Sequence, residues 1–434
     1  MATTSARGPL IEDIIYHVGL CFVPEPWEMA PTPTEADYFE MDMYYLRKLT
    51  YLSRATKRLL EPLLFRFVLL SKPQDVVHFY IDLIQIPRIR EYVRHLACVT
   101  HRRSPGSMSD LRVNRVLQKI LDERIGGREN KLSLMKQGAA WEPFAQACSV
   151  TNTTPEQHLG PGFNMRGNID YMIRSILLTT TKLKTLVWQL DEFYSKSSRT
   201  SEILISAARH DHVLLPDLEV MALNPHPASG CRQYSHLQDF SWERGCWKNL
   251  RRLVLYDTDF DVDFEEMIFK GLGFEVVVPV EELIVMRREG QDIRRVNSSL
   301  DAVISSHGAH RPWDEENLPI FENLKLLDVS FGYFSRRNQE GSAMLETFLR
   351  WVGCPERLRL TGHPPPFNAL GRGAVHSRLK SIRVKEWMDE EDLEQGEVRQ
   401  KVEDWWRGHS AVVPNLEEFI VQRVEESKVY ATKP

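Results

Sequence analysis

The sequence predicts an α/β protein in which an N-terminal all-helical module precedes an irregular solenoid, that is, a parallel sheet with helices outside. Eight short segments between residues 183 and 421 repeat the pattern apolar-x-x-apolar-x-apolar, which suits strands with one buried face. Several of them follow a stretch with helical spacing, and such alternation predicts parallel strands joined by right-handed crossovers. Ahead of them, residues 10–22 and 45–60 show helical spacing.

The first helix is predicted by the spacing of its apolar residues. Leu10, Ile14 and Val18 fall on one helical face, and Pro24 then ends the helix. Prolines and acidic residues follow, so we expect an inserted surface loop over about residues 24–44.

A second helical pattern begins near Tyr45 and runs to Leu60, and Pro62 breaks it. The apolar stretch to Leu70 is expected to be partly extended. The phrase Ser71-Lys72-Pro73 is typical of a helix start, and Pro87 ends the helix that follows.

Strands of a repeating unit are expected in the rest of the chain. A single such strand cannot bury its own apolar face, whereas a stack of them can. The last three apolar positions of the nine matching segments are Val93/Leu96/Cys98, Leu183/Leu186/Trp188, Leu218/Met221/Leu223, Leu250/Leu253/Leu255, Val280/Leu283/Val285, Leu324/Leu327/Val329, Pro355/Leu358/Leu360, Leu379/Ile382/Val384 and Leu416/Phe419/Val421.

Helices are predicted before four of these strands, at Ile169–Leu178, Glu202–Ala208, Met344–Trp351 and Val398–Trp406. The stretch from 102 to 168 is less regular, with one helix expected around 111–121. The predicted organisation is a helical module over 8–71, linking helices and degenerate first repeats over 72–168, the repeat array over 169–424, and a tail over 425–434.

Composition excludes several classes of function. The 55 basic and 60 acidic residues give a formal charge of −5, without the basic stripe that nucleic-acid binding requires. No apolar run approaches the ~18 residues of a membrane span, and Glu12 and Asp13 interrupt the region where a signal peptide would be apolar. The six cysteines are scattered and lack a Cys-x-x-Cys pair, which predicts reduced thiols and a cytoplasmic or nuclear location.

Patterns that could hold a metal fail on geometry. The alternating carboxylates Asp257–Asp263 lack the Gly and Glu that an EF-hand loop needs, because Val262 and Ile268 occupy those positions. Four histidines lie between His210 and His236, but only the first two are closely spaced. We therefore predict no metal, no cofactor and no catalytic residue. An enzyme on a parallel α/β fold is the alternative, and it would need acid/base groups converging after the strands.

Two family resemblances follow from these motifs. Residues 93–424 resemble a leucine-rich repeat array of the long, irregular kind, although the usual Asn or Cys after each strand is absent. The segments Leu10–Val18, Leu46–Leu59 and Glu61–Ser71 resemble an F-box domain. The last of them, followed by a helix, Pro87 and the strand at Val93–Leu96, is similar to the F-box proteins of filamentous fungi. Departures from the F-box pattern are the order Pro9-Leu10, inverted from the usual Leu-Pro, and the long insertion after the first helix.

The F-box resemblance implies a substrate-recognition subunit of a cullin ubiquitin ligase, with no enzymatic activity of its own. The helical module would dock onto a Skp-type adaptor, and through it a cullin, while the array would bind a protein substrate. The expected adaptor-binding residues are Pro9, Leu10, Ile14, Ile15, Leu49, Leu52 and Ser53. A module this small buries little of its own surface, so apolar residues are left for an interface; the alternative is that they pack against the first repeat.

Exposed basic residues within the predicted strands are the candidates for substrate binding, and they favour an acidic protein partner. They are Lys184, Arg251, Arg252, Lys325, Lys380 and Arg383. The alternative function is a leucine-rich-repeat-like interaction scaffold with a vestigial F-box and no ubiquitin role.

Overall fold

The computed structural model describes residues 8–26, 33–99, 110–126, 128–150, 152–159, 165–189, 215–223, 249–256, 280–286, 323–330, 355–361, 378–385 and most of 400–422. The chain divides into two compact units. The N-terminal unit is Met1–Asn249 with Gly271–Gly273, and the C-terminal unit is Leu250–Lys270 with Phe274–Pro434.

The N-terminal unit begins with three helices, α1 (Gly8–Leu20), α2 (Pro33–Thr50) and α3 (Arg54–Leu64). Both α1 and α2 pack on α3. The close approach of α1 depends on Gly19, where an added Cβ would lie 2.6 Å from Cδ2 of Leu60.

The loop predicted over 24–44 is wrong in its second half, because α2 begins at Pro33. Proline suits the first turn of a helix, and Glu35 in that turn interacts favourably with the helix dipole. Buried Phe39 and Met43, four residues apart, then seat the helix on the core. The single helix expected from Tyr45 to Leu60 is likewise two helices, broken before the N-cap of α3 at Ser53. The predicted break at Pro62 is wrong, because Pro62 lies inside α3, which continues to Leu64.

The rest of the N-terminal unit alternates strands with helices. The strands are β1 (Phe67–Leu70), β2 (His95–Val99), β3 (Thr185–Gln189) and β4 (Val220–Leu223); the helices are α4 (Pro73–Gln85), the 3₁₀ helix η1 (Pro87–Glu91), α5 (Asp110–Ile125), α6 (Arg128–Lys136), α7 (Trp141–Val150), α8 (Pro155–His158) and α9 (Met165–Thr179). All four strands are parallel and pair in chain order. The predicted helices at 111–121 and 169–178 are confirmed within α5 and α9, while α6 to α8 were not predicted.

Buried tyrosines connect these helices. The carbonyls of Leu134 and Met135 lie at the end of α6, where they accept the N–H groups of Gln137 and Gly138 at 3.1 and 3.0 Å. The hydroxyl of Tyr80 on α4 also donates to the Leu134 carbonyl at 3.2 Å, and the hydroxyl of Tyr171 on α9 donates to the Met135 carbonyl at 2.6 Å. Burial raises the pKa of both phenols, so they remain donors over the whole physiological pH range.

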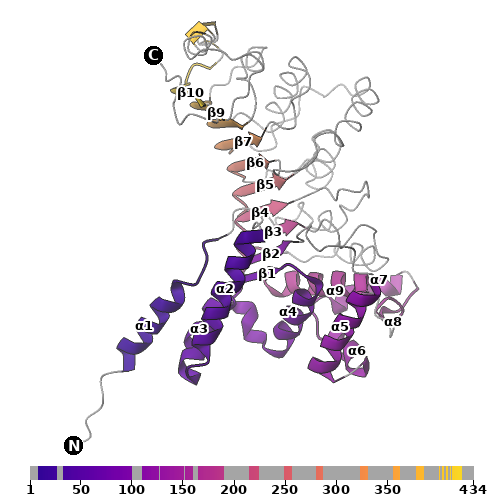
Figure 1. The fold of residues 1–434 in the computed structure, drawn as a ribbon. Helices are drawn as coiled ribbons and strands as arrows, with labels where there is room; N and C mark the ends of the chain where they lie inside the picture. Colours follow the sequence, from indigo (N-terminus) through magenta and orange to yellow (C-terminus); the bar gives the residue numbers. More distant parts are fainter. Residues whose placement is uncertain are drawn as a thin grey trace, which may run out of the picture. The chain divides into compact units, whose positions relative to one another are not determined.

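The C-terminal unit contains the remaining strands, which are again parallel and paired in chain order (Figure 1). They are β5 (Arg252–Tyr256), β6 (Glu282–Met286), β7 (Leu326–Ser330), β8 (Arg357–Thr361), β9 (Ser381–Lys385) and β10 (Glu418–Gln422). Their register aligns Leu253, Leu283, Leu327, Leu358, Ile382 and Phe419, all at most 3% exposed, and we call this side the leucine face.

Each of the nine predicted segments therefore forms a strand, and the α/β class with parallel strands is confirmed. The β1 strand adds one that the sequence pattern indicated only as partly extended. The helices predicted at 202–208 and 344–351 lie outside the described residues, and that at 398–406 is described only in part.

Candidate functional site

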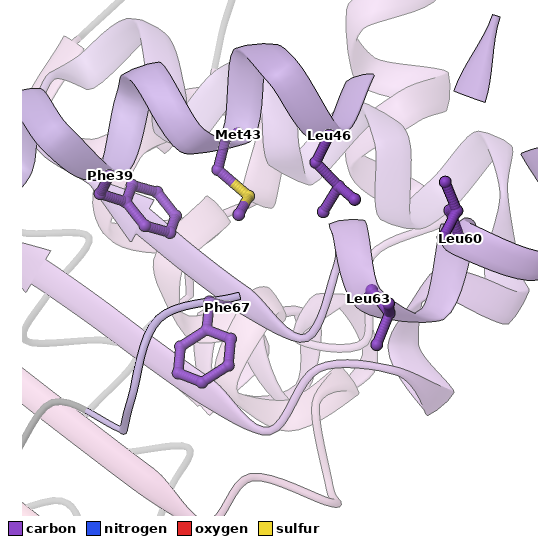
Figure 2. Packing of buried hydrophobic residues seen from close by; sticks show 6 residues of the cluster. All are labelled: Phe39, Met43, Leu46, Leu60, Leu63 and Phe67. Carbon is purple, nitrogen blue, oxygen red and sulfur yellow. The ribbon is translucent and has the colours of Figure 1, made fainter. Parts of the chain in front are cut away.

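The helical module has a core of its own. Figure 2 shows Phe39, Met43 and Leu46 of α2 pointing toward Leu60 and Leu63 of α3, with Phe67 of β1 beside them. These six side chains are at most 9% exposed. Partly buried apolar residues pack around this cluster, and the predicted adaptor-binding residues Ile15 and Leu49 are among them.

An apolar stripe is left exposed on α1. Ile11, Ile14 and Val18 are 56%, 55% and 42% exposed. Their spacing of three and four residues places them on one side of the helix. We call these three residues the α1 stripe. Because α1 packs on α3 through a different side, at Gly19, the stripe is available to a partner.

The other predicted adaptor-binding residues have different surroundings. Leu52, after the end of α2, is 65% exposed. Ser53 is the N-cap of α3, and its hydroxyl accepts the Thr56 N–H at 3.0 Å, so it has a local structural role. Pro9 and Leu10 lie in the first turn of α1, and their side chains are outside the described part.

A second exposed apolar surface, on the outer side of α2, was missed by the sequence analysis. Tyr38, Met41 and Tyr45 are 60%, 47% and 47% exposed and share one side of the helix. Phe22 stacks on Tyr45, with ring centroids 5.8 Å apart. Their spacing of three and four residues is visible in the sequence. We did not predict this helical surface because most of the segment was predicted as part of the loop over 24–44.

Most of the basic residues predicted to bind substrate form ion pairs with carboxylates. The side-chain pairs are Lys184–Glu219 at 2.7 Å, Arg252–Glu282 at 2.6 Å, Lys325–Glu281 at 2.9 Å, Lys380–Glu356 at 3.2 Å and Arg383–Glu418 at 3.4 Å. Each acidic partner belongs to the neighbouring strand or directly precedes it. Exposed Arg251 precedes β5, and its carbonyl accepts the N–H groups of Glu281 and Glu282 at 2.8 and 2.9 Å.

The residues that directly precede the strands of the C-terminal unit alternate in charge. In order they are Arg251, Glu281, Lys325, Glu356, Lys380 and Glu417. Opposite charges side by side on neighbouring strands attract, whereas like charges repel. This alternation was visible in the sequence, but its consequence depends on the register of the strands.

A buried histidine lies in the sheet of the N-terminal unit. The register places His95 of β2 between Phe67 of β1 and Thr185 of β3. Its ring stacks on Phe67 with centroids 4.3 Å apart, and Nδ1 lies 3.0 Å from Oγ1 of Thr185. Burial, aided by the charges of Arg66 and Lys184, lowers the pKa of His95 from 6.5 to about 4. This imidazole is therefore neutral at physiological pH.

Among the described residues, no group of three or more His, Cys, Asp or Glu side chains could hold a metal ion. The carboxylate run Asp257–Asp263 and the histidines from His210 to His236 lie outside those residues. The described helices also include none that is long and apolar enough to cross a membrane. Neither a scan against protein-family models nor a search of curated proteins found a match for this chain.

Proposed function

We propose that the helical module docks the chain onto a Skp-type adaptor of a cullin ubiquitin ligase, and that the parallel sheet binds a protein substrate. The observation that carries this proposal is the α1 stripe. Three apolar side chains about half exposed on one side of a short helix are typical of a surface that a partner covers. The same residues resemble part of an F-box domain, and for this reason we propose a Skp-type adaptor as the partner.

In this role the chain carries out no covalent chemistry. Its contribution is proximity, since holding a substrate near the charged end of the ligase raises the effective concentration of the substrate lysine. A cytoplasmic or nuclear location belongs to this proposal. The free thiols of Cys21, Cys98 and Cys148 are in keeping with it.

The test is co-expression of the full-length chain with a Skp-type adaptor, followed by size-exclusion chromatography. We expect the two proteins to co-elute, and Ile11→Asp with Ile14→Asp to abolish co-elution, because charged side chains would replace the apolar contact. Val150→Asp is the matched control, since Val150 is an exposed apolar residue on α7 (79% exposed). Undiminished co-elution of the double variant would contradict the proposed docking surface.

The alternative is an interaction scaffold without a ubiquitin role. The partial burial of Ile15 and Leu49 in the core of the module favours it, because fewer of the expected docking residues then face a partner. Failure of the unmodified full-length chain to co-elute with the adaptor would support this alternative.

A further inference from the structure

On the side of the sheet opposite the leucine face, the residues at the centre of the strands form a row. This row is apolar on β5, β6 and β10 but charged on β7, β8 and β9. On each strand of the C-terminal unit this residue lies between two leucine-face positions, and alternation directs it to the other side of the sheet. Across the six strands the row consists of Val254, Ile284, Asp328, Arg359, Arg383 and Ile420. Charges thus occupy three consecutive strands of an otherwise apolar row.

Two of these charges are alike and face each other. Arg359 of β8 and Arg383 of β9 are direct partners in the register of the sheet. Neighbouring strands lie only about 4.8 Å apart, and like charges directly opposite each other destabilise a sheet. Elsewhere on this unit opposite charges are paired, as in Arg252–Glu282 at 2.6 Å. The arginine pair therefore departs from the rule that the rest of the unit follows.

The flanking carboxylates pair with these two arginines at longer distances than those of the other ion pairs described above. Asp328 lies 3.9 Å from Arg359, and Glu418 lies 3.4 Å from Arg383. Glu418 also accepts the hydroxyl of Ser381 at 2.6 Å, so its charge is shared. Exposed Arg357 adds a third guanidinium on the same side of β8.

The two guanidinium groups are also accessible. The side chains of Arg359 and Arg383 are 35% and 38% exposed. Each guanidinium has five N–H donors in a fixed planar fork that matches a carboxylate. The arginines can therefore each take a further anionic partner, and such a partner would also relieve their mutual repulsion.

We propose that Arg359 and Arg383, with Arg357 beside them, bind the Asp and Glu side chains of an acidic segment of a protein substrate. This inference rests on the proposed function of the sheet as the substrate surface. It keeps Arg383 from the predicted substrate-binding residues and places the binding position at the centre of β8 and β9 rather than at the residues before the strands. The chain carries a formal charge of −5 without a basic stripe, which disfavours a nucleic acid, so an acidic protein segment fits better.

The experiment measures binding of a fluorescein-labelled octaglutamate peptide to the full-length protein by fluorescence anisotropy. We expect salt-sensitive binding, and Arg359→Gln with Arg383→Gln to weaken it by at least about tenfold, since charge-assisted hydrogen bonds are lost. The matched control is Lys325→Gln with Lys380→Gln, which removes the same charge from the same unit but leaves the arginine pair intact. Its affinity should stay close to that of the unmodified protein.

Thermal unfolding of the same variants separates binding from a structural role. If the arginines bind a ligand, their replacement should leave the unfolding midpoint of the full-length chain unchanged or raise it, because a repulsion is removed. A lowered midpoint together with unchanged peptide affinity would overturn the proposal, as would equal losses of affinity in both double variants or no binding of the peptide. The assay contains no adaptor, so its outcome is independent of the co-elution test.

Discussion

At the scale of single residues, the sheet determines the environment of side chains to which the sequence patterns assign no role, and His95 is an example. His95 occupies a strand position that alternation directs away from the apolar face, yet it is only 4% exposed. Its neighbours in the register, Phe67 and Thr185, supply a stacking ring and a hydroxyl. Those neighbours come from 28 residues before and 90 residues after His95 in the sequence, so only the folded sheet reveals the environment.

The lowered pKa of His95 makes the stability of the N-terminal unit depend on pH. Between pH 6.5 and about 4 the unfolded chain binds a proton that the folded imidazole does not, so stability falls as the pH falls through this window. A shift of this size corresponds to about 3 kcal/mol when the window has been crossed. Arg66, Arg94 and Lys184 act with burial to keep the imidazole neutral, while Glu219 opposes them.

We expect His95→Gln to remove this part of the pH dependence. Urea unfolding of both proteins at a series of pH values from 7 to 4 measures it, and the difference between the two curves isolates His95 from the other titrating groups. Replacement of His78, which lies on α4 and is partly exposed, is the control. Identical pH dependence of His95→Gln and the unmodified protein would contradict the assignment.

At the scale of helices and strands, local patterns predicted the strands better than the helices. All nine apolar-x-x-apolar-x-apolar segments form strands, because each needs only its own alternating side chains and a neighbour of the same kind. The helix α2 was predicted to start twelve residues too late, at Tyr45 rather than Pro33. Its first turns carry an acidic, tyrosine-rich sequence, and their helical face is recognised only once Phe39 and Met43 have a core to pack on.

The packing of α1 on α3 can be tested by a substitution at Gly19. An added side chain at Gly19 would collide with Leu60, which is fully buried and has little room to move. We expect Gly19→Val to destabilise the module by about 1–3 kcal/mol through overpacking. Chemical unfolding of the full-length chain measures the loss, and proteolysis after the α1 segment should become faster.

Gly408 provides the matched control for this substitution. It is also in a helical segment, but an added Cβ there would meet nothing within 4 Å. Gly408→Val should therefore change stability only by the small difference in helix propensity between these residues. Equal effects of the two substitutions would show that steric contact between α1 and α3 is not the cause.

For the molecule as a whole, the sequence shows which residues are charged, whereas the register of the strands determines which charges lie next to one another. Lys325 and Lys380 were candidates for a substrate surface, and each is paired with a glutamate that precedes a neighbouring strand. Arg359 was overlooked although it stands between two strand leucines, the same position as Arg383 in the next repeat. Which residues become lateral neighbours depends on repeats 24 to 44 residues apart, and no local pattern contains that information.

The adaptor surface and the acidic-segment surface should act independently. The α1 stripe and the β8–β9 arginines belong to different compact units and share no residue. Energetic effects of sites that have no residue or contact partner in common are usually additive. A variant carrying all four substitutions should therefore bind octaglutamate as the arginine double variant does, and it should fail to co-elute with the adaptor as the isoleucine double variant does. Anisotropy and size-exclusion chromatography of all three variants measure this. A change in peptide affinity caused by Ile11→Asp and Ile14→Asp alone would instead demonstrate coupling between the units, because those residues carry none of the charge that the peptide recognises.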